Sequence, residues 1–227
     1  MPRNIEQLVS EQVRRAEIAR EQAAETGGPY TRPVVSISRG MGSGARVIAG
    51  KLAEELGWSL WDKNMLDAIA ENAHVSRRVV EAFDEKTVSE IEVLVKAVFG
   101  DHETGGFVYA RHLARAVAAV ATLGNAIILG RGANLLLPDA LSIRIDASDE
   151  RRVQNMMSYE SLTRDEAVAK IRKSDKERRS FLVNTFGKER VEHVRYDLTI
   201  WMDKFGTEGA VGIIKAAIAA KYEGIPQ

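Results

Sequence analysis

The sequence contains no cysteine and only four histidines among its 227 residues. The absence of cysteine excludes a disulfide-stapled scaffold, a catalytic thiol and metal sites held by cysteine, and it fits a reducing compartment. The histidines are scattered and lack the regular spacing of metal-binding motifs. We therefore expect no metal centre built from protein ligands alone.

The chain also lacks net charge and long apolar runs. Its 32 basic residues balance 32 acidic ones, whereas proteins that coat nucleic acids usually carry a strong basic excess. The longest uncharged run, residues 116–130, contains Gly124 and Asn125 and is shorter than the roughly 18 apolar residues of a membrane helix. The N-terminal segment is too charged for a secretion signal. We expect a cytoplasmic protein with no nucleic-acid or membrane partner.

What the sequence does contain is an alternation of strand and helix patterns. Short apolar or β-branched runs predict five strands, at residues 33–38, 58–61, 126–129, 141–145 and 197–201. Helical patterns separate them, one of which opens with the capping-box spacing of Thr163 and Glu166. The alternation predicts an α/β domain over residues 29–227, with a mainly parallel sheet covered by helices on both faces.

A separate amphipathic helix is expected ahead of this domain. Apolar residues from Ile5 to Ala16 recur at helical spacing within residues 4–24, and the glycines and proline at 26–29 predict a linker. Residues 1–28 thus form a unit of their own. The simpler role for this helix is packing on its own domain; the alternative is an arm that makes a homodimer.

The most informative segment follows the first predicted strand. There Gly40, Gly42 and Gly44 alternate with Met41 and Ser43 before a helical pattern begins. In a strand–loop–helix unit, successive backbone N–H groups and the positive end of the helix attract an anion, and glycine lets the backbone approach it closely. The segment predicts a phosphate-binding loop, with an ordinary flexible turn as the alternative.

This loop departs from the P-loop pattern, in which the second glycine is followed by lysine and then serine or threonine. With Gly44 as the second glycine, Ala45 occupies the lysine position, Arg46 the hydroxyl position and Arg39 the first-glycine position. Arg39 and Arg46 flank the loop and offer positive charge with bidentate geometry. We expect them to supply the charge that the missing lysine does not.

Taken together, several segments resemble the cytidylate kinase-like family, relatives of the bacterial (d)CMP kinases. The likeness extends from about Pro33 to Ala217 and depends on the order and spacing of short motifs. These are ISRGMGSGAR at 37–46, WDKNML at 61–66, FDEK at 83–86, ILGRGANLLLPDA at 128–140, IDASDERR at 145–152, KSDKERRSF at 173–181, FGKE at 186–189 and YDLTI at 196–200.

The resemblance implies a P-loop NTPase-type three-layer sandwich, with a helical monophosphate-binding region at about 62–123 and a helical lid at about 160–190. It implies ATP and Mg²⁺ as cofactors and small-molecule nucleotides as ligands. The donor phosphates are expected on the glycine loop and its flanks, with the residues Arg39, Gly40, Gly42, Ser43, Gly44, Ala45 and Arg46.

By the same resemblance, Asp62 and Lys63 open the monophosphate side and Arg131 grips the acceptor phosphate. CMP kinases usually continue with an aspartate that helps to hold the acceptor nucleotide, but this chain has Gly132. Base and sugar preference therefore do not carry over from that position.

The lid segment supplies the remaining residues that the resemblance implies for catalysis. Asp175 is expected to orient the site, and Arg178 and Arg179 to reach the transferring phosphate, together with Arg46 and Arg131. On the residues alone, the basic positions of this segment also fit an ordinary solvated helix face.

Some residues have a plainer interpretation beside the functional one. Asp146, at a strand end, is either a Mg²⁺ ligand or, as we favour, a helix cap. Asp62 also suits a helix cap, but its place at the carboxyl edge of the sheet favours ligand binding. Trp58, Trp61 and Trp201 occupy strand positions and are expected in the core.

These features favour phosphoryl transfer from ATP to a nucleoside monophosphate, with CMP or dCMP suggested by the resemblance. Such a reaction needs positioned positive charge more than covalent chemistry, and residues 172–195 hold eight basic and four acidic residues. The alternative is a nucleotide-binding or regulatory module with little turnover, because Ala45 stands at the lysine position.

Overall fold

The computed structural model describes residues 4–25, 33–72, 79, 83, 85–99 and 108–222, so the predicted linker at 26–29 lies outside the described residues. All five predicted strands are confirmed: β1 (Val34–Arg39), β2 (Ser59–Trp61), β3 (Ala126–Leu129), β4 (Leu141–Asp146) and β5 (Leu198–Trp201). The helices are α1 (Ile5–Glu25), α2 (Ala45–Leu56), α3 (Lys63–Glu71), α5 (Glu85–Phe99), α6 (Val108–Leu123), α7 (Ala133–Leu136), α8 (Asp149–Glu160), α9 (Arg164–Phe186), α10 (Lys188–Glu192) and α11 (Thr207–Lys221).

The strands form one parallel sheet in the order β2-β3-β1-β4-β5. The chain therefore goes from β1 to the edge strand β2, returns to place β3 between them, and then crosses to the other side of β1 for β4 and β5. The carboxyl ends of β1, β3 and β4 meet where this direction changes, which is the place where open α/β sheets bind ligands.

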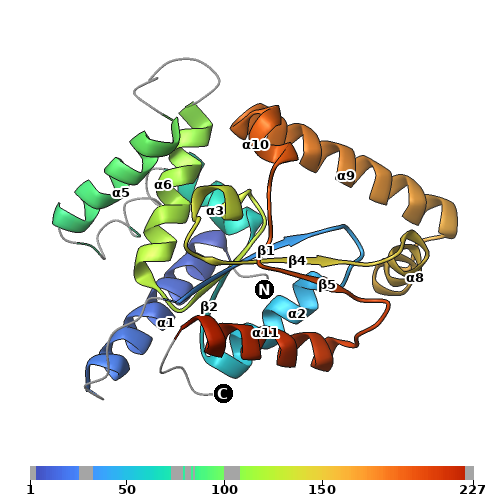
Figure 1. Cartoon of the computed structure of the whole chain (residues 1–227), viewed down its shortest axis with the longest axis horizontal. Helices are drawn as coiled ribbons and strands as arrows, with labels where there is room; N and C mark the ends of the chain where they lie inside the picture. Colours follow the sequence, from blue (N-terminus) through green and yellow to red (C-terminus); the bar gives the residue numbers. More distant parts are fainter. Residues whose placement is uncertain are drawn as a thin grey trace.

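Helices cover both faces of the sheet, as the α/β pattern predicts (Figure 1). Side chains alternate along each strand, so Val35 and Ile37 of β1 pack with α2 and α11, whereas Val34 packs with α3 and α6. The result is a P-loop-type three-layer sandwich. Thr163 and Glu166 form the predicted capping box at the start of α9, which runs above the carboxyl edge of the sheet.

The three tryptophans do not all lie in the core. Trp58 and Trp61 are buried as predicted, but the prediction for Trp201 was wrong, because this residue is 45% exposed. Its strand, β5, is at the edge of the sheet. Ile200 takes the core-facing position there, which leaves Trp201 on the opposite face.

The N-terminal helix packs on its own domain. Val9, Val13 and Ala16 of α1 are buried in the same cluster as residues of α3 and α6. The side-chain oxygen of Gln12 also accepts a hydrogen bond of 2.8 Å from the backbone N–H of Leu60 in the edge strand β2. The helix thus satisfies a donor of an open sheet edge; a homodimer through α1 stays a prediction.

Two kinds of feature are absent from the described residues. None of their helices has the length and apolar character needed to cross a membrane. Among the same residues, histidines and carboxylates do not gather in threes as a protein-built metal centre requires.

Candidate phosphate-binding site

The glycine loop leads directly from β1 into α2. Gly42 and Gly44 have φ of 79° and 82°, a left-handed conformation that favours glycine. Gly44 is the N-cap of α2 and provides no side-chain cap. The first N–H groups of α2 consequently have no capping side chain and lie at the positive end of the helix, as an anion site requires.

Two side chains of α8 hold this loop in place. Arg152 donates to the carbonyl of Met41 and Asn155 to that of Gly42, both at 2.7 Å. A Cβ on Gly42 would lie 2.6 Å from the carbonyl oxygen of Arg152. Close packing against α8 is therefore a second reason for glycine here, besides the expected approach of a phosphate.

Arg39, the last residue of β1, carries the most unusual charge of the site. Within the described part of the chain its guanidinium has no hydrogen-bond or ion-pair partner, and it lies against Gly130, where a Cβ would collide with it. Burial and the charge of Arg178 lower the pKa of Arg39 to about 10, although Asp62 opposes the shift. A shielded cation that forms no ion pair with a carboxylate is suited to receive an anion.

Arg131 sits in a tight turn after β3. It has a φ of 56° and is flanked by Gly130 and Gly132, which also have positive φ. Its guanidinium forms a bidentate pair with Asp67 of α3, with Nε 2.7 Å from Oδ1, and lies 4.4 Å from the ring centre of Phe181 in α9.

Arg46 and Asp62, predicted to serve the donor and acceptor sides, contact each other. Arg46 is 79% exposed and its Nη2 lies 3.1 Å from Oδ2 of Asp62. The other oxygen of Asp62 accepts from the backbone N–H of Asn64 and Met65 and so caps α3. The helix-cap interpretation of Asp62 is thus confirmed, and ligand binding by this residue stays a prediction.

The three residues predicted for the lid all lie in α9 and reach different places. Arg178 donates to the backbone carbonyl of Arg39 at 3.1 Å, and burial lowers its pKa although Asp175 opposes the shift. Asp175 pairs with Arg152 at 2.5 Å. Arg179 also faces the site but pairs with Glu192 at 3.3 Å. Lid and loop are therefore joined mainly through Arg178 and the Asp175–Arg152 pair.

A cavity of about 720 Å³ lies between the carboxyl edge of the sheet and α9. Its apolar wall includes Phe181, Leu182, Val191 and Val194. Its basic residues are Arg39, Lys63, Arg131, Arg144, Arg152, Arg178 and Arg179, and its acidic ones are Asp175 and Glu177. A cavity lined by both cationic and apolar side chains suits a phosphorylated organic molecule.

The sequence model of the "Cytidylate kinase-like family" matches residues 34–204, which include the loop, the turn and the lid. The chain belongs to this family. It is 33% identical over 100 residues to the cytidylate kinase of Pyrococcus abyssi, covering 44% of this chain and 55% of that protein. For the cytidylate kinase of Pyrococcus horikoshii, the values are 32% over 109 residues, 48% and 57%.

The chain spans about half the length of the curated relatives it matches. A solved structure, of an uncharacterized protein from Eubacterium ventriosum, is similar over 83% of this chain and 99% of that one, with a TM-score of 0.54 and 21% identity. This likeness supports the fold alone.

The cytidylate kinase-like chain has a structural reason for its glycine after Arg131. A Cβ on Gly132 would collide with the ring of Phe186 and lie 3.1 Å from Leu182. Side chains of α9 thus occupy the space into which an aspartate at this position would extend. The departure from the CMP kinase motif is therefore built into the packing of the lid.

The cap interpretation of Asp146 was wrong. The N-cap of α8 is Ser148, whose side chain accepts from the backbone N–H of Arg151. Asp146 instead bonds Arg144 through Oδ2 and the N–H of Ala147 through Oδ1.

Sequence reasoning missed Arg144, Arg152 and Asp67 as members of the site. Arg152 is buried, although it follows Arg151 in a charged helix turn of ordinary appearance. The only sequence signal for it was its place in the IDASDERR motif. Arg144 lies within a strand and Asp67 in the middle of α3. Neither position carries a local signal.

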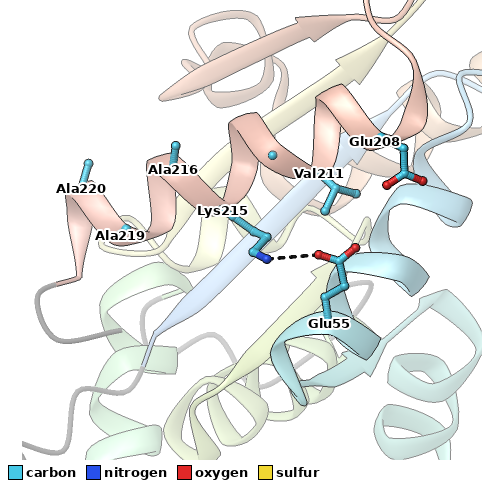
Figure 2. A pocket seen from close by; sticks show the side chains of 8 residues that line it. Glu55, Glu208, Val211, Lys215, Ala216, Ala219 and Ala220 are labelled. Atoms are coloured by element: carbon cyan, nitrogen blue, oxygen red, sulfur yellow. Dashed lines mark hydrogen bonds and ion pairs between the residues drawn. The ribbon is translucent and has the colours of Figure 1, made fainter. Parts of the chain in front are cut away.

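A second hollow lies away from the carboxyl edge of the sheet, as a groove of about 540 Å³ between α2 and α11. Figure 2 shows its alanine-rich wall and the ion pair of 3.1 Å between Lys215 and Glu55. No residue predicted for the site lines this groove.

Proposed function

We propose that this chain transfers a phosphoryl group from ATP to a nucleoside monophosphate, with CMP and dCMP as the first candidates. The observation that carries the proposal is the unpaired guanidinium of Arg39, placed between the glycine loop, the Arg131 turn and the lid. Like-charged arginines surround it, and a phosphate bound among them would neutralise their repulsion.

The donor nucleotide would bind with its phosphates at the glycine loop and the amino end of α2, beside Gly40, Gly42, Ser43, Gly44 and Ala45. Arg39 and Arg46 would provide the charge that the P-loop lysine supplies elsewhere. Arg178, whose side chain is already bonded to the backbone of Arg39, would contact the transferring group and stabilise the charge that develops on it.

The acceptor monophosphate would occupy the side of the cavity that Lys63 and Arg131 line. Arg131 would bind its phosphate, and the apolar wall of α9 and α10 would contact the base. Asp175 orients the lid by holding Arg152, which in turn bonds the glycine loop. In-line transfer requires this relative positioning of donor and acceptor above all.

The residues present also fit a Mg²⁺ ion that arrives with the nucleotide. The hydroxyl of Ser43 is buried and has no hydrogen-bond partner. Asp146, at the end of β4, lies beside Gly40, which belongs to the same loop as Ser43. Such ions usually keep several waters and bind through one or two protein oxygens and the phosphates. When bound, Mg²⁺ would neutralise charge on the phosphates.

The test is a coupled assay of ADP release with CMP, dCMP, UMP, AMP and GMP as acceptors. Turnover above a no-enzyme blank with at least one of them is expected, and Lys215→Ala, in the remote groove, serves as the matched control. Rates equal to the blank with every acceptor would rule out the proposal.

A nucleotide-binding module with little turnover is the second candidate. It is favoured by Ala45, which is buried at the first position of α2 and brings no ammonium group to the phosphates. Calorimetry separates the two: ATP binding with no phosphoryl transfer supports the module, whereas turnover that is lost in Arg46→Ala supports the kinase.

A further inference from the structure

Arg131 is fixed at both its backbone and its side chain. The left-handed turn fixes its backbone conformation. Asp67 accepts hydrogen bonds from the Nε–H and one Nη2–H of its guanidinium. Arginine has five N–H donors in a rigid plane, so three remain after this bidentate pairing. Because Arg131 lines the cavity, the pairing with Asp67 determines how those donors are presented to a ligand.

Asp67 is itself held in place by a second helix. The hydroxyl of Tyr109, in α6, donates to Oδ1 of Asp67 at 2.7 Å, the same oxygen that accepts from Nε of Arg131. Burial and this hydrogen bond raise the pKa of Tyr109 above its ordinary value. The hydroxyl therefore stays protonated and remains a donor at neutral pH.

The lid completes this cluster through one aromatic side chain. The ring of Phe181 lies under the guanidinium of Arg131 at 4.4 Å and meets the ring of Tyr109 edge-on, with 6.3 Å between ring centres. A cation over an aromatic face is attracted to it, and more strongly when water is excluded. One arginine thus joins α3, the turn after β3, and α9.

We propose that Asp67 is a positioning residue, which, supported by Tyr109, aims Arg131 at the phosphate of the acceptor. The inference rests on the proposed function and deepens it, since it assigns the acceptor side of the site to a carboxylate that makes no contact with the substrate itself. Loss of Asp67 should affect the acceptor more than the donor, because the glycine loop and Arg39 do not depend on it.

The chain offers a matched pair with the same geometry outside the cavity. Arg115 of α6 and Glu92 of α5 form a bidentate pair, with Nε–Oε1 at 2.6 Å and Nη2–Oε2 at 3.0 Å, and neither residue lines the cavity. Glu92→Gln therefore measures the effect of losing such an ion pair at a place that does not line the cavity.

The experiment compares Asp67→Asn, Tyr109→Phe and Glu92→Gln with the wild type. In Asp67→Asn, the KM for the best acceptor should rise about 10- to 100-fold, the scale on which a misaligned group costs rate, while the KM for ATP changes less than about twofold. Tyr109→Phe should show the same asymmetry more weakly, and Glu92→Gln should leave both constants unchanged.

A readout independent of turnover accompanies the kinetics. Exchange of the Arg131 Nε–H proton with water, followed by NMR, should be slow in the wild type and fast in Asp67→Asn, with Arg115 Nε–H unaffected. The inference is overturned if Asp67→Asn raises both KM values equally or leaves the acceptor KM unchanged. If this variant does not fold, Tyr109→Phe decides by the same criterion.

Failure of the proposed function would be recognised separately. If the wild type phosphorylates no monophosphate, calorimetric titration with CMP and with inorganic phosphate still tests Asp67. Weaker binding to Asp67→Asn than to Glu92→Gln supports the positioning role, and equal binding to both overturns it.

Discussion

The protein has two hollows of comparable size, one at the carboxyl edge of the sheet and one between two helices that cover a face of it. The groove between α2 and α11 has about 540 Å³ and the cavity beneath α9 about 720 Å³. In the groove, charges are matched: Lys215 pairs with Glu55, and Lys51 with Glu208. Seven basic but only two acidic residues line the cavity, and one of the basic residues, Arg39, forms no ion pair among the described residues, although the charge of Asp62 acts on its pKa.

The difference shows that uncompensated charge, more than volume, distinguishes a binding site. Shielded like charges destabilise a fold, and the structural contacts that Arg131, Arg152 and Arg178 make do not explain why Arg39 is left among them without an ion pair. A ligand that brings negative charge does account for it. The groove, by contrast, is lined by alanines and by the ion pair of Lys215 with Glu55, which belong to the packing of two helices (Figure 2).

The largest effect is expected from Arg39→Met, which removes the unpaired cation but keeps a long side chain. Loss of one preorganised group that stabilises transition-state charge costs about 100- to 1,000-fold in rate. We expect a fall of that size in kcat/KM with the best acceptor, measured by ADP release. A loss of less than about threefold would show that Arg39 does not face the phosphates.

The same variant should be more stable than the wild type when no anion is present. Because the folded protein lowers the pKa of Arg39 to about 10, the charged form costs stability fully below that pH. The cost is relieved as the pH rises from about 10 towards the ordinary value. In phosphate-free buffer at pH 8, Arg39→Met should melt about 2–4 °C higher, as expected for 1 kcal/mol in a domain of this size.

The stability difference also gives a control for the ligand. Pyrophosphate should raise the melting temperature of the wild type and not that of Arg39→Met, and the advantage of the variant should shrink above pH 10. An equal response of both proteins to pyrophosphate would place the anion elsewhere.

A smaller effect, on stability, is expected from adding a methyl group where the loop packs closely against α8. Gly42→Ala places a methyl group 2.6 Å from the carbonyl oxygen of Arg152, whereas Gly44→Ala, at nearly the same φ, meets open space. The left-handed conformation alone costs about 1–2 kcal/mol. Gly42→Ala should therefore lower the free energy of unfolding in urea by at least about 1 kcal/mol more than Gly44→Ala; equal losses would contradict the packing seen here.

The smallest effect is expected in the groove. Lys215→Ala breaks the pair with Glu55 at the protein surface, and such pairs contribute about 0–1 kcal/mol. Its kcat/KM should equal that of the wild type within about twofold. A loss comparable to that of Arg39→Met would mean that the two hollows do not differ as proposed.

Much of this comparison could be predicted from the sequence, because it depends on local patterns. The capping-box spacing of Thr163 and Glu166 predicts the start of α9. The apolar run Ala126–Leu129 predicts a strand buried on both faces. The glycine loop likewise follows from residues adjacent in the chain. Each of these features is determined within one or two turns of the backbone.

Other features involve residues far apart in sequence and could not be predicted in this way. Asp67 bonds Arg131, which is 64 residues away in the sequence, and Arg152 bonds Met41, which is 111 residues away. No pattern in the residues next to Asp67 or Arg152 predicts these contacts. Trp201 was misplaced because a strand pattern does not tell whether the strand will lie at an edge. Asp146 was misjudged because Ser148 is better placed to cap α8.

By itself, the sequence determined the order of strands and helices, the glycine loop and the supply of arginines around it, since periodicity and turn chemistry act over short distances. Only the tertiary structure decided which arginines are neutralised. Asp62, Asp67 and Asp175 pair with three of them, while Arg39 is left shielded and unpaired in the described part of the chain. Charge compensation depends on distances in space, and these exist only once the sheet has brought its carboxyl ends together.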